Sequence, residues 1–156
     1  MKIEPREYEL PSGKALLVRS VTAADAEVHI KFKCMTSGET HFMARYPEEC
    51  VYSPETAASL AACEESPFNF EVGAFVGISI EQKYWGGGLG SYLMQLAIDQ
   101  ARANGFEQLE LGVYSDNSRA IHLYEKFGFE RYGIQPRAFK LKDGTYRDEI
   151  IMVKML

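Results

Sequence analysis

The sequence contains no run of apolar residues that approaches the about 18 in succession that a membrane-spanning helix needs. Half of its first residues, 1–6, are charged, and they lack the apolar core of a signal peptide. The three cysteines, Cys34, Cys50 and Cys63, form no closely spaced pair, so we expect packed, reduced thiols and neither a disulfide nor a metal site. These absences predict a cytoplasmic chain with no membrane partner and no bound metal.

An excess of positive charge is also missing, since the sequence has 17 Lys and Arg against 22 Asp and Glu, for a net charge of −5. A general nucleic-acid binder needs a basic face, so we expect no nucleic-acid partner. What the chain does have is apolar and aromatic content, with 46% hydrophobic residues, nine Phe and nine Tyr. That content in 156 residues predicts one folded domain, 1–156, around a single core.

The hydrophobic periodicity predicts an alternation of strands and helices. We expect strands at 16–18, 70–81 and 109–113, and a final hairpin of 138–141 and 150–153 across Asp143 and Gly144. We expect helices from Thr22 to Gly38, from Ser53 onward, from Leu89 to Asn104, and over 118–127. The strand–helix order after residue 74 makes this an α/β protein.

A glycine loop lies between the predicted strand 70–81 and the helix that follows it. It consists of Gly86, Gly87, Gly88, Leu89, Gly90 and Ser91. The first backbone N–H groups of a helix have no internal partners, and glycines let an anion approach them closely. The segment therefore predicts a phosphate or pyrophosphate site. A tight turn without a ligand is the simpler alternative, although so many glycines are costly for a turn alone.

Two other phosphate motifs fit this loop less well. A P-loop needs a lysine that is absent here. A dinucleotide fingerprint starting at Gly86 needs a glycine where Ser91 stands, although Glu107 or Glu110 lies where its ribose-binding acid would. A dinucleotide-binding oxidoreductase therefore stays open as an alternative function.

Two segments resemble the GNAT superfamily of N-acetyltransferases. The loop 85–90 is similar to its acetyl-CoA motif [QR]-x-x-G-x-[GA], with Gly88 and Gly90 at the small positions and Trp85 in place of Gln or Arg. The segment 117–129 matches every fixed position of the family's N-x-x-A-x-x-L-Y-x-x-x-G-F. This resemblance, which extends over about 78–156, implies the GNAT-like acyl-CoA N-acyltransferase fold, a central twisted mixed sheet with helices on both faces.

The resemblance implies acetyl transfer from acetyl-CoA, as co-substrate, to a primary amine by direct attack on the thioester. The loop 86–91 would hold the pyrophosphate, and a strand edge at Ile80, Glu81 and Gln82 would pair with the pantetheine arm, with the Ile80 N–H as oxyanion donor. Asn117 would bind pantetheine or serve only as a helix N-cap. Tyr124 would protonate the departing thiolate; its alternative is a core aromatic.

The general base and the acceptor are left open. The base candidates are Glu81, Glu110, Tyr114 and His122, or a chain of waters. The acceptor is a small-molecule amine or a protein or peptide amine, and a homodimer through the last strands is compatible with the sequence. A non-catalytic acyl-CoA-binding or sensing module with the same loop is a further alternative.

One departure from the family concerns the hairpin that usually precedes the strand before the glycine loop. Here 67–75 runs almost directly into 76–80. Either the sheet is reduced by one hairpin or the sequence is shortened near Phe75 to Gly77, and the change could leave the protein inactive.

Overall fold

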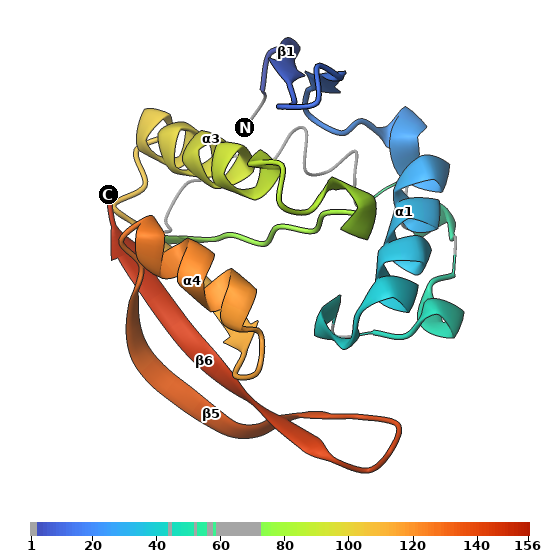
Figure 1. The fold of residues 1–156 in the computed structure, drawn as a ribbon, viewed down its shortest axis with the longest axis vertical. Coiled ribbons are helices and arrows are strands. Elements are labelled where there is room, and N and C mark those ends of the chain that lie inside the picture. Colours follow the sequence, from blue (N-terminus) through green and yellow to red (C-terminus); the bar gives the residue numbers. More distant parts are fainter. Residues whose placement is uncertain (1–2, 44, 52, 56–57, 59–72) are drawn as a thin grey trace. The chain divides into compact units, whose positions relative to one another are not determined.

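The computed structural model describes residues 3–43, 45–51, 53–55, 58 and 73–156 (Figure 1). The chain forms two compact units, the first made of 1–69 and 79–90 and the second of 70–78 and 91–156, and each is considered by itself. Pro54 and Glu55 are helical, but most of the helix predicted from Ser53 lies outside the described residues. Residues 59–72 also lie outside the described residues, whereas the join at Phe75 to Gly77, where a hairpin was expected to be missing, is described.

The first unit contains a short antiparallel hairpin and one long helix. The strands β1 (Arg6–Glu9) and β2 (Ala15–Val18) pair directly, so the predicted strand 16–18 is confirmed, while β1 was not predicted. The helix α1 (Ala26–Glu39) follows one turn of 3₁₀ helix. It extends one residue beyond Gly38, where the sequence predicted its end.

The helical segment starts at Thr22, as predicted, and a capping box with Asp25 forms there. The Asp25 carboxylate accepts hydrogen bonds from the Thr22 amide and hydroxyl, both at 2.8 Å. Arg19 holds the other side of the same carboxylate through two bonds of 2.7 Å. The Arg19 guanidinium, together with the Thr22 bonds, holds the pKa of Asp25 well below its usual range.

The second unit is a mixed four-stranded sheet with two helices. The strand order is β3-β4-β6-β5, in which β3 is parallel to β4 and the other neighbours are antiparallel. The strands are β3 (Gly73–Phe75), β4 (Gln108–Tyr114), β5 (Glu130–Lys140) and β6 (Tyr146–Met155), and the helices are α3 (Leu89–Ala103) and α4 (Ser118–Lys126). The predicted final hairpin is confirmed, and its turn places Gly144 at φ +81°.

The core of this unit lies on one face of the sheet. Alternate residues of β4 point into it, namely Leu109, Leu111 and Val113, because successive side chains of a strand face opposite sides. Residues of β6, α3 and α4 complete the cluster: Ile150, Met152, Met94, Ile98, Ala101 and Ile121. The expected mixed α/β fold is therefore confirmed.

The strand predicted over 70–81 is much shorter than expected. Pairing with β4 ends at Phe75 and Glu110, with one further hydrogen bond of 2.9 Å from the Val76 amide to the Glu110 carbonyl. Beyond it the chain is irregular and then forms a short 3₁₀ helix, Gln82–Tyr84. Gly77 lies in this irregular stretch. It has no side chain to pack against a neighbouring strand, so glycine weakens a strand at this position.

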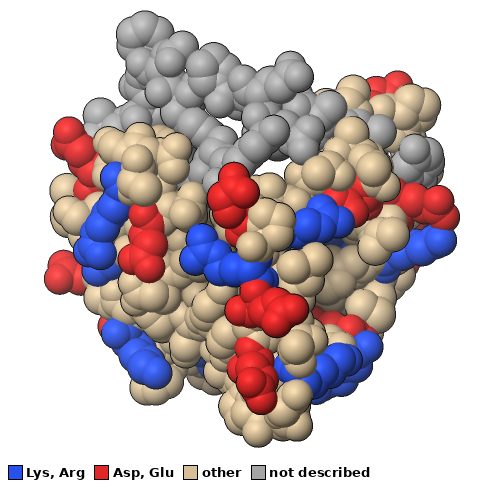
Figure 2. Space-filling model, turned by 90° about the horizontal axis from the view of Figure 1, so that it is seen from above, with Lys and Arg blue, Asp and Glu red and all other residues tan. Residues whose placement is uncertain are grey.

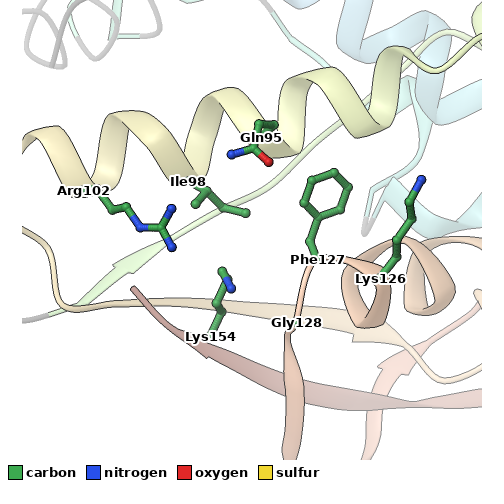
Figure 3. A pocket seen from close by; sticks show the side chains of 7 residues that line it. All are labelled: Gln95, Ile98, Arg102, Lys126, Phe127, Gly128 and Lys154. Atoms are coloured by element: carbon green, nitrogen blue, oxygen red, sulfur yellow. The ribbon is translucent and has the colours of Figure 1, made fainter.

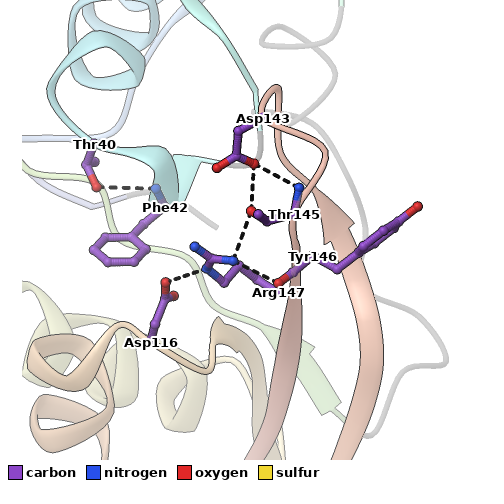
Figure 4. A network of polar contacts seen from close by, with 7 residues as sticks. All are labelled: Thr40, Phe42, Asp116, Asp143, Thr145, Tyr146 and Arg147. Atoms are coloured by element: carbon purple, nitrogen blue, oxygen red, sulfur yellow. Dashed lines mark hydrogen bonds and ion pairs between the residues drawn. The ribbon is translucent and has the colours of Figure 1, made fainter.

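One polar network fastens β6 to the loop after β4. The Arg147 Nε donates to Asp116 at 2.8 Å, and its Nη1 donates to the Thr145 hydroxyl at 3.1 Å and to the Tyr146 carbonyl at 2.9 Å (Figure 4). Asp143 accepts from the Thr145 amide and hydroxyl and so closes the hairpin turn. The loop that leads into α4 is thereby held against the sheet.

The surface shows both signs of charge. On the face drawn in Figure 2, acidic and basic side chains are interspersed among uncharged ones. In the part of the chain that the structure describes, no helix combines the length and the apolar character that crossing a membrane requires.

We expect Met152→Ala to lower the free energy of unfolding by about 2–5 kcal/mol, because Met152 is 0% exposed and its truncation leaves a cavity. Met155 on the same strand is 66% exposed, so Met155→Ala is the matched control, with a change within about 0.5 kcal/mol. Urea unfolding measures both. Equal losses in the two variants would contradict the assignment of the core face.

Candidate functional site

The glycine loop adopts a backbone that only glycine accepts easily. Gly86 and Gly88 have φ values of +80° and +81°, in the left-handed region. The helix α3 begins directly after them, at Leu89. Among the described residues, the amides of 86–91 have no hydrogen-bond acceptor outside α3 itself. The loop thus presents a series of free N–H groups at a helix N-terminus, the arrangement that binds a phosphate or pyrophosphate.

Side chains at the end of and just after β1 lie close to this loop within the first unit. A Cβ at Gly87 would lie 3.8 Å from Leu10 Cδ2, and one at Gly88 would lie 3.5 Å from the Tyr8 hydroxyl. Lys14 donates a hydrogen bond of 2.9 Å to the Tyr84 hydroxyl. Lys14 therefore brings positive charge to the side chain of Tyr84, which precedes the loop in sequence.

The segment 80–85 forms a braced turn in place of the predicted strand edge. The Trp85 indole donates to the Ile80 carbonyl at 2.8 Å, and the Gln82 amide donates to the Glu39 carboxylate at 2.7 Å. Glu81 forms an ion pair with Lys83. Of the three residues predicted to meet the pantetheine arm, Gln82 has its amide bonded to Glu39, whereas the amides of Ile80 and Glu81 donate to no described group. The roles of Ile80, Glu81 and Gln82 stay predictions.

Trp85 stands where the resemblance has Gln or Arg, and its contact explains how the turn tolerates the change. Its indole N–H closes the chain back onto Ile80, so the side chain acts on the loop's own backbone. The free amides of the glycine loop do not depend on it.

Tyr124 lies on α4 in the second unit and packs against the core cluster, with its ring centroid 6.0 Å from that of Phe129. Burial raises the pKa of the Tyr124 phenol, so the group stays protonated at neutral pH. Its hydroxyl has no hydrogen-bond partner among the described residues, yet it is not among the fully buried polar atoms. A protonated phenol with a free, accessible hydroxyl can donate a proton or a hydrogen bond to a ligand.

Asn117 caps α4, as one of its two predicted roles required. Its side-chain oxygen accepts a hydrogen bond of 3.2 Å from the Ala120 amide. The side-chain nitrogen donates to no other described residue, so the cap leaves one donor available for a ligand.

The end of the β3–β4 ladder lies in the same unit as Tyr124. Val76 and Ile78, which follow β3, pack against the same core cluster as Tyr124. The strand β4 continues to Tyr114, four residues past the last bond with the β3 segment at Glu110. Two parallel strands that stop pairing in this way leave backbone groups of both available to an extended ligand.

The four residues considered as general base differ in their surroundings. Glu81 is paired with Lys83, and both oxygens of Glu110 accept hydrogen bonds, at 2.8 Å from Gln108 and at 3.0 Å from Tyr132. Tyr114 is buried and stacks on Phe139 with 3.9 Å between ring centroids, and His122 is exposed on α4. The hydrogen bond to Glu110 raises the pKa of Tyr132. None of the four is a free carboxylate.

One carboxylate beside β4 was missed by the sequence analysis. Glu149 of β6 lies across the ladder from Tyr114, and its side chain rests over the backbone of Gly112. The signal that could have found it is Gly112 itself, a glycine between the buried Leu111 and Val113 in the middle of a strand.

A hollow of about 440 Å³ lies elsewhere in the second unit, along α3 and beside the C-terminal end of α4 (Figure 3). Its lining consists of Gln95, Ile98, Arg102, Lys126, Phe127, Gly128 and Lys154. It includes none of the residues predicted to bind or transform a ligand. Among the described residues, no group of three or more side chains could hold a metal ion.

Comparison with known proteins relates the chain to one family of enzymes. The model of the acetyltransferase (GNAT) family matches residues 20–129. A crystal structure of an acetyltransferase of the GNAT family from Streptococcus pneumoniae has a TM-score of 0.79 and 28% identity, over 88% of this chain and 98% of that one. The Salmonella typhimurium yncA structure with acetyl-CoA has a TM-score of 0.73 and 20% identity, over 88% and 92%, and shows likeness of fold alone.

Curated relatives match over a shorter stretch. The [ribosomal protein bS18]-alanine N-acetyltransferase of Escherichia coli is 36% identical over 75 residues, which are 48% of this chain and 50% of that protein. The mycothiol acetyltransferase of Streptosporangium roseum is 36% identical over 63 residues, 40% of this chain and 19% of that protein. The chain thus spans half or less of the length of these relatives.

We expect Gly88→Ala to weaken acetyl-CoA binding about tenfold or more, because a side chain at φ +81° strains the loop and displaces its amides. Calorimetric titration measures the affinity. Gly144→Ala is the matched control, since Gly144 has the same φ in the final hairpin turn and the same strain. An equal loss of affinity in both variants would contradict a specific role for the loop.

Proposed function

Since the chain belongs to the acetyltransferase (GNAT) family, we propose that it transfers an acetyl group from acetyl-CoA to a primary amine by direct attack on the thioester. The observation that carries this proposal is the pair of left-handed glycines, Gly86 and Gly88, directly before α3. They leave a row of amides free at a helix N-terminus, which fits a pyrophosphate.

In this proposal the loop 86–91 holds the pyrophosphate through its amides. Acetyl-CoA supplies the acetyl group as a thioester. Asn117 offers its side-chain nitrogen, and Ile80 its amide, as donors to the pantetheine arm or the thioester oxygen.

Tyr124 acts as the general acid. Its phenol gives its proton to the sulfur as the C–S bond breaks, because a thiolate left unprotonated would return to the carbonyl. Burial raises the pKa of the phenol, which keeps the proton on Tyr124 until the thiolate forms.

The acceptor is a primary amine of a small molecule or of a protein. The names of the relatives point to both kinds, since one is named for an alanine of ribosomal protein bS18 and another is named a mycothiol acetyltransferase. A panel that contains a peptide with an N-terminal alanine, free lysine and spermidine covers these chemical classes.

A non-catalytic acyl-CoA-binding module is the second candidate, because the free amides of the loop would serve it equally well. The two differ at Tyr124, whose free hydroxyl a binding module does not need. A transferase releases coenzyme A thiol only when an amine is present and forms the acetylated amine in equal amount.

We expect Tyr124→Phe to lower kcat by about 10²–10⁴-fold with little change in acetyl-CoA affinity, because it removes a proton donor and no binding surface. Thiol release with the amine panel gives kcat, and calorimetry gives the affinity. Tyr146→Phe, at an exposed tyrosine of the final hairpin, is the control with unchanged kcat. Undiminished turnover in Tyr124→Phe would remove Tyr124 from the mechanism.

A further inference from the structure

The side chain of Glu149 occupies the space above Gly112 that any other residue at 112 would fill. A Cβ at Gly112 would lie 2.6 Å from the Glu149 Cδ, closer than real Cβ atoms approach, and 3.2 Å from its Cγ, which is a tight contact. Glu149 pairs across the ladder with Tyr114, so it is the diagonal neighbour of Gly112 on the same face. The glycine at 112 is therefore what lets the carboxylate lie against β4.

This carboxylate has no partner within the described part of the chain. Glu149 is partly buried, and no hydrogen bond or ion pair satisfies it there, whereas both oxygens of Glu110 on the same face accept hydrogen bonds. Gly112 is exposed although it lies mid-strand between buried residues, so a ligand can approach the carboxylate. A partly buried, unpaired carboxylate attracts a cation that can donate hydrogen bonds.

Glu149 and Tyr124 lie on opposite sides of the same stretch of β4. Tyr124 packs in the cluster that contains Leu111 and Val113, whose side chains point to the core face. A side chain at Gly112, which lies between them, would point to the other face of the sheet, where Glu149 lies. A thioester held where the β3–β4 ladder ends, next to this stretch, would have a proton acceptor on one side and a proton donor on the other.

We propose that Glu149 binds the ammonium group of the acceptor and acts as the general base of acetyl transfer, a role that rests on the function proposed above. Glu149 accepts one proton from the ammonium, and the nitrogen lone pair then forms the C–N bond while the C–S bond breaks. Tyr124 gives its phenolic proton to the sulfur, and the second proton lost by the nitrogen restores the phenol. Glu149 releases its proton to solvent, which completes the balance.

The charged and titratable groups around Glu149 within this unit are consistent with that role. Tyr114 faces it from β4 and the uncharged Gln135 faces it from β5, both in direct register. Arg147, two residues away on β6, is held by Asp116 at 2.8 Å. Glu110, farther along the face, is bonded to Tyr132. Among the described residues, Arg147 is thus paired with Asp116 and not with Glu149, whose charge is left for the acceptor.

The first test is Glu149→Gln, assayed with acetyl-CoA and the peptide, lysine and spermidine panel. We expect kcat/KM to fall by about 10²–10⁴-fold at neutral pH. The loss should shrink as the pH rises toward the amine's own pKa of about 10, because free amine needs no base. Glu130→Gln, at an exposed acid of β5, is the control with an unchanged profile.

The second test moves the carboxylate to the neighbouring strand. A Cβ at 112 falls close to the present carboxylate, so Gly112→Asp combined with Glu149→Ala should recover about tenfold or more of the activity lost in Glu149→Ala. Such a rescue also shows that the variants fold. A merely structural glutamate would not be replaced from the other strand.

A third measurement needs no turnover. Calorimetric titration with spermidine, without acetyl-CoA, should show about tenfold weaker binding to Glu149→Gln, with acetyl-CoA affinity unchanged. If Glu149→Gln turns over as the wild type does, with the same pH profile, the role of Glu149 is refuted while the transferase stands. If the wild type acetylates no amine of the panel, it is the proposed function that fails.

Discussion

The hydrogen bond from the Val76 amide to the Glu110 carbonyl is the last described bond between the β3 segment and β4. The arrangement of the second unit depends on where this strand pairing ends. Before it, parallel pairing places β3 at the edge of the sheet. After it, β4 continues to Tyr114 with no described strand paired on that side. The core beneath is continuous across this point, since Val76 and Ile78 pack with Leu111 and Val113. Backbone pairing between the β3 segment and β4 can therefore end at this point while the core side chains beneath stay packed.

Glycine serves two distinct purposes in this chain. At Gly86 and Gly88 it supplies a left-handed backbone that no other residue adopts without strain, and so it exposes the amides before α3. At Gly112 the backbone is ordinary, and what matters is the missing side chain, since the Glu149 carboxylate takes its place. A glycine count cannot separate these roles, because only the φ value and the neighbouring strand distinguish them.

Local patterns predicted most of the elements because their causes are local. The cap at Thr22, the strand through Leu111, the N-cap at Asn117 and the turn at Gly144 each depend on residues close in sequence. The strand predicted over 70–81 was wrong in length, because pairing with β4 decides where a strand ends and apolar alternation does not. β1 was missed for a similar reason, since its pairing with β2 defines it.

The residues of the candidate site were likewise predictable only where the signal is local in sequence. The glycine loop and Tyr124 came from motifs, and burial of Tyr124 agrees with a phenol that keeps its proton. Glu149 could not be found in this way, since 36 residues of sequence lie between it and Gly112 and only the antiparallel register of β4 and β6 brings them together. The braced turn at Ile80 also needed the structure, because it depends on the indole of Trp85.

The measurement that tests the central claim most directly is a calorimetric titration of the protein with acetyl-CoA, and with NADH as a second ligand. The free amides before α3 predict binding of acetyl-CoA with a dissociation constant of about 1–100 μM and no binding of NADH. Binding of NADH without acetyl-CoA would contradict the account and favour a dinucleotide enzyme. Binding of neither would show that the glycine loop is a turn without a ligand.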